Sequence, residues 1–152
     1  MSTPQSGDLD PERLARVRKR IARLCERGLE EAWVAEVAGA LLLGLTSVRR
    51  VMQEQDLGAP EALIEVIRHE VAAIREFAQP QAVILTVVLA LEAEYVGLSA
   101  PDRHRIAAET FRGSRGRPVS PATMRKYHLP KAQFRLARRL LRRELEVQDQ
   151  TT

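Results

Sequence analysis

The residues best suited to chemistry are the Arg and Lys side chains that crowd the last third of the chain. Residues 100–152 hold 13 Lys or Arg against five Asp or Glu, whereas residues 31–99 hold four against ten. Guanidinium and ammonium groups bind phosphate, and a strongly basic segment is typical of proteins with a polyanionic partner, most often nucleic acid. The sequence therefore predicts a basic, nucleic-acid-binding portion at 100–147.

The basic residues are overwhelmingly Arg. Only Lys19, Lys126 and Lys131 are lysines, so the other 21 of the 24 basic residues are Arg, and the chain has no Asn. Phosphate contact is one interpretation of this excess, and codon bias in a GC-rich genome is the other. Codon bias accounts for the overall number of Arg residues but not for their clustering near one end.

Patterns typical of catalysis or metal binding are poorly represented. His69-Glu70 begins like the zinc-protease motif H-E-x-x-H, but Ala73 occupies the position of the second ligand. Cys25 is the only cysteine, and its place beside the apolar stripe of the first helix predicts a buried, unreactive thiol. We expect no enzymatic activity, no cofactor and no metal site. The single cysteine and the lack of a signal peptide favour a cytoplasmic location.

The elements that must position the basic residues are predicted to be helices throughout. Apolar residues recur at helical spacing, and the breaks between segments fall at Gly and Pro. These patterns predict an all-α fold, a compact bundle of six to eight helices forming a single domain over 1–152, with residues 1–8 and 148–152 disordered. The predicted helices cover approximately 11–27, 29–42, 46–57, 60–78, 80–96, 100–112, 121–127 and 131–146.

Two of these helices have informative apolar patterns. Residues 80–96 are apolar nearly all round, which predicts a central core helix. Their longest apolar run is about half a membrane span, so no membrane partner is expected. The residues predicted to be buried there are Val83, Ile84, Val87, Val88 and Leu91. On the last helix, the residues predicted to face the core are Phe134, Ala137, Leu141 and Leu145.

Two segments resemble the helix-turn-helix of bacterial transcription regulators, in which a second helix enters the major groove. Residues 37–51, V-A-G-A-L-L-L-G-L-T-S-V-R-R-V, match the spacing of this motif without gaps. Here the resemblance implies that Thr46 caps the second helix and that Val48 and Val51 anchor it. Its outward-facing residues would be Arg49 and Arg50.

The second resemblance covers residues 106–127, with a longer loop than the motif usually has. It implies that Ser120 caps a recognition helix at 120–128, which Met124 anchors. This match is favoured because its surroundings are basic. The predicted nucleic-acid-binding residues are Arg112, Arg115, Arg117, Ser120, Thr123, Arg125, Lys126, Arg135, Arg138, Arg139 and Arg142. The secondary candidates, from the first match, are Thr46, Ser47, Arg49 and Arg50.

The expected function is that of a small cytoplasmic DNA-binding protein, a bacterial or phage transcriptional regulator that contacts duplex DNA with its basic C-terminal helices. Two alternatives stay open: a helical adaptor that binds another protein, such as a transcription-machinery subunit, through its acidic helices, and an RNA-binding protein. Salt bridges from the Arg residues of the last helix to the acidic helices of 54–94 would weaken the DNA interpretation. Six aromatic residues are too few to predict a base-stacking platform. A homodimer also stays open.

Overall fold

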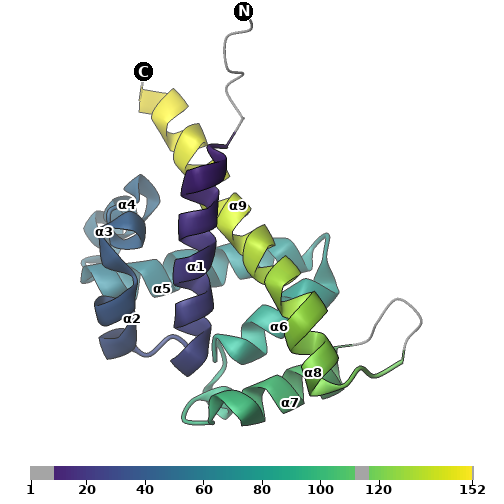
Figure 1. Cartoon of the computed structure of the whole chain (residues 1–152). Helices are drawn as coiled ribbons and strands as arrows, with labels where there is room; N and C mark the ends of the chain where they lie inside the picture. The colour runs from purple at the N-terminus through teal and green to yellow at the C-terminus, as the bar shows by residue number, and fades with distance from the viewer. Residues whose placement is uncertain (1–8, 112–116, 152) are drawn as a thin grey trace, which may run out of the picture.

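The computed structural model describes residues 9–111 and 117–151, with side chains described up to Glu146. Figure 1 shows the arrangement of the helices. Their bounds are α1 (Pro11–Arg27), α2 (Glu31–Val37), α3 (Gly39–Leu43), α4 (Thr46–Gln55), α5 (Ala59–Arg75), α6 (Gln79–Val88), the 3₁₀ turn η1 (Ala93–Tyr95), α7 (Ala100–Thr110), α8 (Pro121–Thr123), the π-helical turn η2 (Met124–His128) and α9 (Leu129–Thr151).

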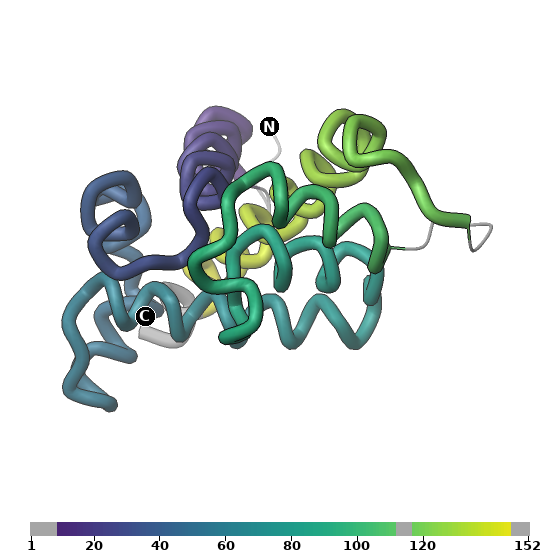
Figure 2. Tube along the Cα trace, turned by 90° about the horizontal axis from the view of Figure 1, so that it is seen from below, coloured from purple at the N-terminus to yellow at the C-terminus, as the bar shows by residue number. Residues whose placement is uncertain are grey.

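The all-helical bundle predicted from the sequence is confirmed. The described ranges contain no strand, and they hold eight helices when the uninterrupted run α8–η2–α9 is counted once. The long helix α9 organises the bundle, because it packs against α1, α4, α5 and α6. In both views of the backbone α1 lies between α2 and the C-terminal helical run, and α6 and α7 are neighbours (Figures 1 and 2).

The helix starts predicted from capping residues are largely confirmed. The Asp10 carboxylate accepts from the amide of Glu12 at 3.0 Å, and the Ser99 hydroxyl accepts from the amide of Asp102 at 3.2 Å. Gly28 ends α1 at φ +80°, and a Cβ there would meet the Cβ of Ala90 at 3.0 Å. These signals act within a few residues of the chain, so they can be read without knowing the fold.

Three predicted helices are wrong in extent. The last one, predicted to end at 146 before a disordered stretch at 148–152, continues as α9 to Thr151. The segment 29–42 is not one helix, because Gly39 at φ +65° separates α2 from α3. The central helix ends at Val88 and does not reach residue 96, because Ala90 turns the chain at φ +53°. There the carbonyl of Leu89 accepts from the amide of Leu29 at 2.8 Å, which joins the end of α6 to the end of α1.

The central position of α6 is confirmed by burial. Ile84, Val87, Val88 and Leu91 are all buried, as predicted, whereas Val83 is only partly buried. The helix touches α5, α7 and α9, so its apolar residues meet neighbours on several sides. Within the described residues, no helix combines the length and apolar character needed to span a membrane.

The core-facing side of α9 differs from the prediction at two positions, Phe134 and Leu145, of which Leu145 is only partly buried. Ala137 and Leu141 are buried as expected, but Phe134 is 41 % exposed. Leu136 and Leu140 are completely buried instead. Because α9 contacts helices on more than one side, its buried surface is wider than a single stripe and is rotated away from Phe134.

Arg103, a buried arginine of α7, connects the ends of α1 and α6 through hydrogen bonds. It is 2 % exposed, and its guanidinium donates to the carbonyls of Val88, Leu98, Cys25 and Glu26. Several of these carbonyls lie at the ends of α1 and α6, where helices leave acceptors without partners. Part of the Arg excess is therefore structural.

Candidate nucleic-acid interface

The predicted recognition element begins with the expected cap. The Ser120 hydroxyl accepts from the amide of Thr123 at 3.1 Å and donates to the Thr123 hydroxyl at 2.9 Å. Met124 is completely buried, as expected of a residue that points into the protein. Arg125 and Lys126 are exposed on the outer side. This short segment therefore presents two cations on a firmly packed base.

The segment after Met124 does not end as a separate helix. The sequence predicts a break at Pro130, but the chain continues through η2 directly into α9. Proline lacks an amide hydrogen and its ring collides with the carbonyl four residues earlier in an α-helix. The wider π turn at Met124–His128 lies immediately before Pro130 and lets the helix continue. Residues 121–128 are thus the first turns of the long C-terminal helix.

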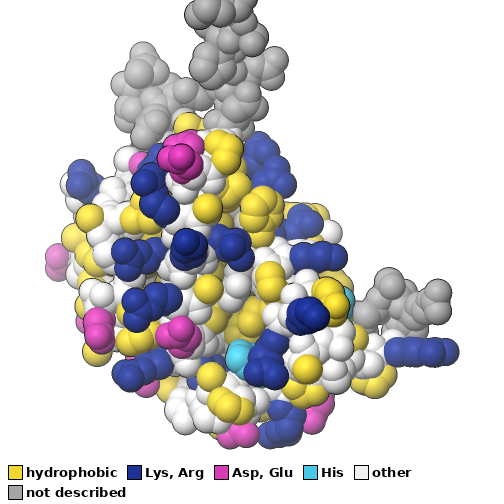
Figure 3. All heavy atoms as spheres, viewed as in Figure 1, with side chains coloured by type: hydrophobic (Ala, Val, Ile, Leu, Met, Phe, Trp, Pro, Cys, Tyr) yellow, Lys and Arg dark blue, Asp and Glu magenta, His cyan; other side chains and the backbone are white. Residues whose placement is uncertain are grey.

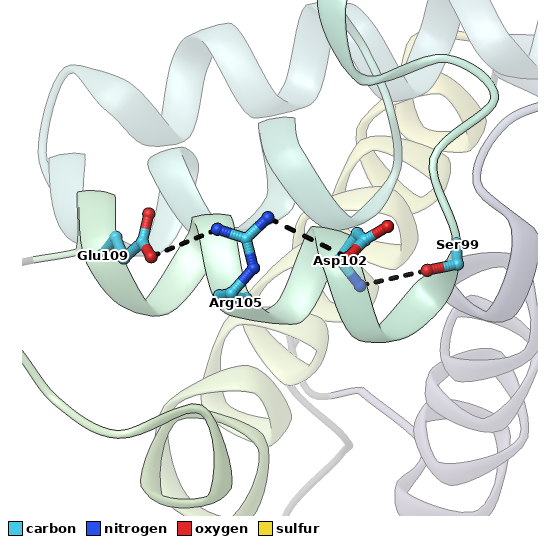
Figure 4. A network of polar contacts seen from close by, with 4 residues as sticks. All are labelled: Ser99, Asp102, Arg105 and Glu109. Carbon is cyan, nitrogen blue, oxygen red and sulfur yellow. Dashed lines mark hydrogen bonds and ion pairs between the residues drawn. The ribbon is translucent and has the colours of Figure 1, made fainter.

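His104 of α7 lies close to two cations, one of which is Arg125 of η2. Burial lowers the pKa of His104 on α7, and the positive charges of Arg125 and Arg103 lower it further. The cation Arg105 on the same helix lies between Asp102 and Glu109, at 3.9 Å and 3.3 Å (Figure 4). Arg105 is therefore balanced within α7, whereas the described side chains place no carboxylate within 4 Å of Arg125 or Lys126.

The arginines predicted to form one face of α9 differ in their contacts, because, among the described side chains, one of them is ion-paired and the others are not. Arg139 Nε lies 2.9 Å from the Glu70 carboxylate, and Arg143 Nη1 lies 3.0 Å from it. Glu70 is only 3 % exposed, so this ion-pair cluster ties α9 to α5. The salt-bridge alternative is thus realised for Arg139. The other predicted residues of the face, Arg135, Arg138 and Arg142, have no carboxylate of the described side chains within 4 Å.

The secondary candidate segment, at 37–51, has its helix start occupied by the protein itself. Leu45, and not Thr46, is the N-cap residue of α4. The Glu144 carboxylate of α9 accepts from the Thr46 amide at 2.9 Å and from its hydroxyl at 2.7 Å. Ser47 is 1 % exposed. Thr46 therefore joins α4 to α9, and Ser47 is buried inside the protein.

The remaining predictions for this segment agree with the structure. Val48 and Val51 are buried, as expected of inward anchors, and Arg49 and Arg50 are exposed. In the loop before α8, Arg117 is exposed, while Arg112 and Arg115 lie outside the described residues.

The sequence prediction missed α1 as part of the basic surface. This helix holds seven Lys or Arg against two Glu, and it packs alongside α9. Residues 121–146 hold eight Lys or Arg against two Glu. Figure 3 shows Lys and Arg side chains spread over α1 and α9, with few Asp or Glu among them. Residues 1–30 have a balance of only +2, because acids outside the helix mask its charge.

A groove in this surface combines cations with aromatic rings. It encloses about 610 Å³. Phe77 lies between α5 and α6 and is 55 % exposed, and Phe134 of α9 lines the same groove. The sequence does not predict that these two residues lie close together. Phe77 ends the apolar stripe of α5, and Phe134 was expected in the core. The groove is lined by Arg18, Phe77, Gln81, Pro130, Lys131, Phe134, Arg135, Arg138, Arg139 and Arg142.

Potential metal ligands do not gather in the part of the chain that the structure describes. Among the described residues, no group of three or more His, Cys, Asp or Glu side chains is arranged to hold a metal ion. Cys25 is buried, as predicted, and burial raises the pKa of its thiol to about 12.

Comparisons with the models of known protein families, with curated proteins and with solved structures found no match to this chain.

Proposed function

We propose that this protein binds duplex DNA through a basic face formed by α1 and the helical run of residues 121–146. The observation that carries the proposal is the packing of two strongly basic helices side by side, which concentrates cations that are separated in the sequence. The outward cations that we assign to the face are Arg16, Lys19, Arg23, Arg125, Lys126, Lys131, Arg135, Arg138 and Arg142.

Phosphate contacts would supply most of the affinity of such a face, since each contact releases condensed counterions from the duplex. Arg125 and Lys126 occupy the N-terminal turns of a long helix, which is the part of a recognition helix that approaches base edges in helix-turn-helix proteins. A regulator of transcription would use this end for recognition and α1 with α9 for backbone contact.

The adaptor alternative has less support, because the buried carboxylate of Glu70 is already used to join α5 to α9. RNA remains the second candidate, since an Arg-rich helical surface also suits its backbone. A comparison of duplex DNA with duplex RNA of the same length, by fluorescence anisotropy, separates the two.

The test of the site compares double variants at one salt concentration. We expect Arg125→Ala with Lys126→Ala to weaken duplex binding at least about tenfold, since two phosphate contacts are lost. The matched control is Arg49→Ala with Arg50→Ala, which removes two exposed neighbouring cations from α4. If the control variant abolishes binding and the Arg125/Lys126 variant does not, the basic face is assigned wrongly. Circular dichroism checks that both variants stay helical.

A further inference from the structure

We infer that the groove between α9 and the α5–α6 corner binds unpaired nucleotides of a strand that continues from the duplex. This inference rests on the proposed function and names a substrate feature, a junction between double-stranded and single-stranded nucleic acid. The groove residues that carry it are Phe77 and Phe134, which supply rings, and Lys131, Arg138 and Arg142, which supply cations.

Two exposed aromatic rings, those of Phe77 and Phe134, lie in the groove, where a base-stacking site needs them. Of the four large hydrophobic side chains that are exposed among the described residues, three are aromatic: Phe77, Tyr127 and Phe134. Each has a cation near its ring, with Arg135 at 5.2 Å from Phe77 and Arg138 at 5.8 Å from Phe134. Aromatic faces beside cations stack bases and hold the adjoining phosphates. Half of the six aromatic residues thus lie at the surface, which composition alone does not reveal.

The lining of the groove favours bases over a peptide. Its apolar side chains are those of Phe77, Phe134 and Pro130, and no Leu, Ile, Val or Met of the described residues lines it. Grooves that take an amphipathic peptide helix are hydrophobic along several helical turns, and flexible Met side chains are common in them. Planar rings separated by guanidinium groups match flat bases and charged phosphates instead.

The cations of the groove are available to an anion. Arg139 is paired with Glu70, but no carboxylate of the described side chains lies within 4 Å of the other five: Arg18, Lys131, Arg135, Arg138 and Arg142. From Lys131 to Arg142 they follow α9 for about 16 Å. At the stacked spacing of about 3.4 Å per nucleotide, this length suits several phosphates in succession. A strand therefore fits the groove better than one free nucleotide.

The experiment measures anisotropy of labelled oligonucleotides with the full chain. The probes are a blunt duplex of about 16 base pairs, the same duplex with a single-stranded extension of about four nucleotides, and a third with an extension of equal length that lacks bases. We expect the base-containing extension to tighten binding at least about fivefold, the lower limit of stacking for one base, and the abasic extension to add much less.

Single-residue variants test whether the gain in affinity comes from the groove. Phe134→Ala and Phe77→Ala should each remove most of the gain while binding the blunt duplex within about twofold of wild type, and Phe134→Tyr should retain it. Tyr127→Ala is the matched control, because Tyr127 is an equally exposed ring outside the groove. Circular dichroism confirms that the variants fold.

The outcomes separate this inference from the proposed function. If the blunt duplex binds and the extension adds nothing, or the abasic extension adds as much, the groove is not a base site and duplex binding stands. If the extension binds through Phe134 but the blunt duplex does not bind, the groove site stands and the duplex proposal fails. If no oligonucleotide binds and an acidic peptide containing Phe binds in a Phe134-dependent way, both are overturned.

Discussion

At the scale of single residues, the buried carboxylate of Glu144 forms hydrogen bonds with a residue far away in the sequence. Glu144 of α9 is 4 % exposed and accepts three hydrogen bonds from Thr46, the first residue of α4. A negative charge at a helix start satisfies free amides and interacts favourably with the helix dipole. Glu144 thus caps a helix whose own N-cap residue, Leu45, cannot do so.

We therefore expect Glu144→Ala to lower the free energy of unfolding by about 2–3 kcal/mol, because charged hydrogen bonds at a buried helix start are lost. Glu144→Gln should have a smaller effect, since an amide oxygen still accepts. The matched control is Glu146→Ala, an exposed glutamate on the same helix. Urea denaturation followed by circular dichroism measures the difference, and equal stability of the two alanine variants would contradict the capping role.

The thiol of Cys25 should be chemically quiet. Burial raises its pKa to about 12 from an ordinary value of 9.0, although a hydrogen bond with Gln133 and the charge of Arg103 act in the opposite direction. In the unfolded chain the thiol loses its proton near pH 9, while in the folded chain it keeps it. Its contribution to stability is complete below pH 9 and is lost as the pH rises from 9 toward 12.

Two measurements test this environment. A thiol reagent should label the native protein far more slowly than the denatured protein. Between pH 9 and 11 the stability of the wild type should fall more steeply than that of Cys25→Ala, whose unfolded state has no thiol to ionise. Parallel pH profiles, or equal labelling rates, would show that the thiol is accessible.

At the scale of the elements, α6 is the most buried of the described helices, and α9 packs against α1, α4, α5 and α6. Both helices were predicted from periodicity, but their limits and exposed sides depend on tertiary contacts. The chain leaves α6 at Ala90 because Leu89 bonds to Leu29, and α9 turns Phe134 outward because its other sides are covered. The buried helix α6 therefore packs beneath the basic helix α9.

The core role of α6 predicts a large effect for Val87→Asp. Val87 is 1 % exposed, so the new carboxylate would be buried without a partner and should lower the stability by at least about 3 kcal/mol. Val96→Asp is the comparison, since Val96 is 60 % exposed and its substitution should change stability by about 0.5 kcal/mol or less. Thermal melts of both variants decide this, and a Val87→Asp protein that melts with the wild type would exclude a buried α6.

At the scale of the whole molecule, the fold changes how charge is distributed. The formal charge is only +4, yet α1 and the run 121–146 together place 15 Lys or Arg on adjacent helices, seven from the first and eight from the second. Glu70 neutralises part of this charge internally, through Arg139 and Arg143. The cations that remain form a surface on which many phosphates can be contacted at once.

If about six of these cations contact phosphates, the affinity for duplex DNA should fall about 10³-fold between 50 and 200 mM salt, because each contact releases a counterion. Anisotropy titrations at several salt concentrations give the slope of log affinity against log salt. Arg138→Ala with Arg142→Ala should make that slope shallower, whereas Arg49→Ala with Arg50→Ala should leave it unchanged. A flat salt dependence would show that the basic face does not bind a nucleic-acid backbone.

The sequence by itself determined the helical class, most helix starts and the buried anchors, because these depend on interactions within a turn or two. The Asp10, Ser99 and Ser120 caps each bond within three residues, and Met124 lies on a short apolar face. Helical periodicity likewise placed Val87 and Val88 in the core.

Only the tertiary structure decided which polar groups meet across the bundle and which faces stay open. Glu144 and Thr46 are 98 residues apart, and Glu70 lies 69 residues from Arg139. The groove of Phe77 and Phe134 and the pairing of α1 with α9 also join distant segments. Such contacts follow from how helices pack, and amphipathic patterns allow several packings of similar apolar burial. The physical reason is that periodicity specifies a buried side for each helix, whereas the choice of partner depends on the shapes and charges of all the helices together.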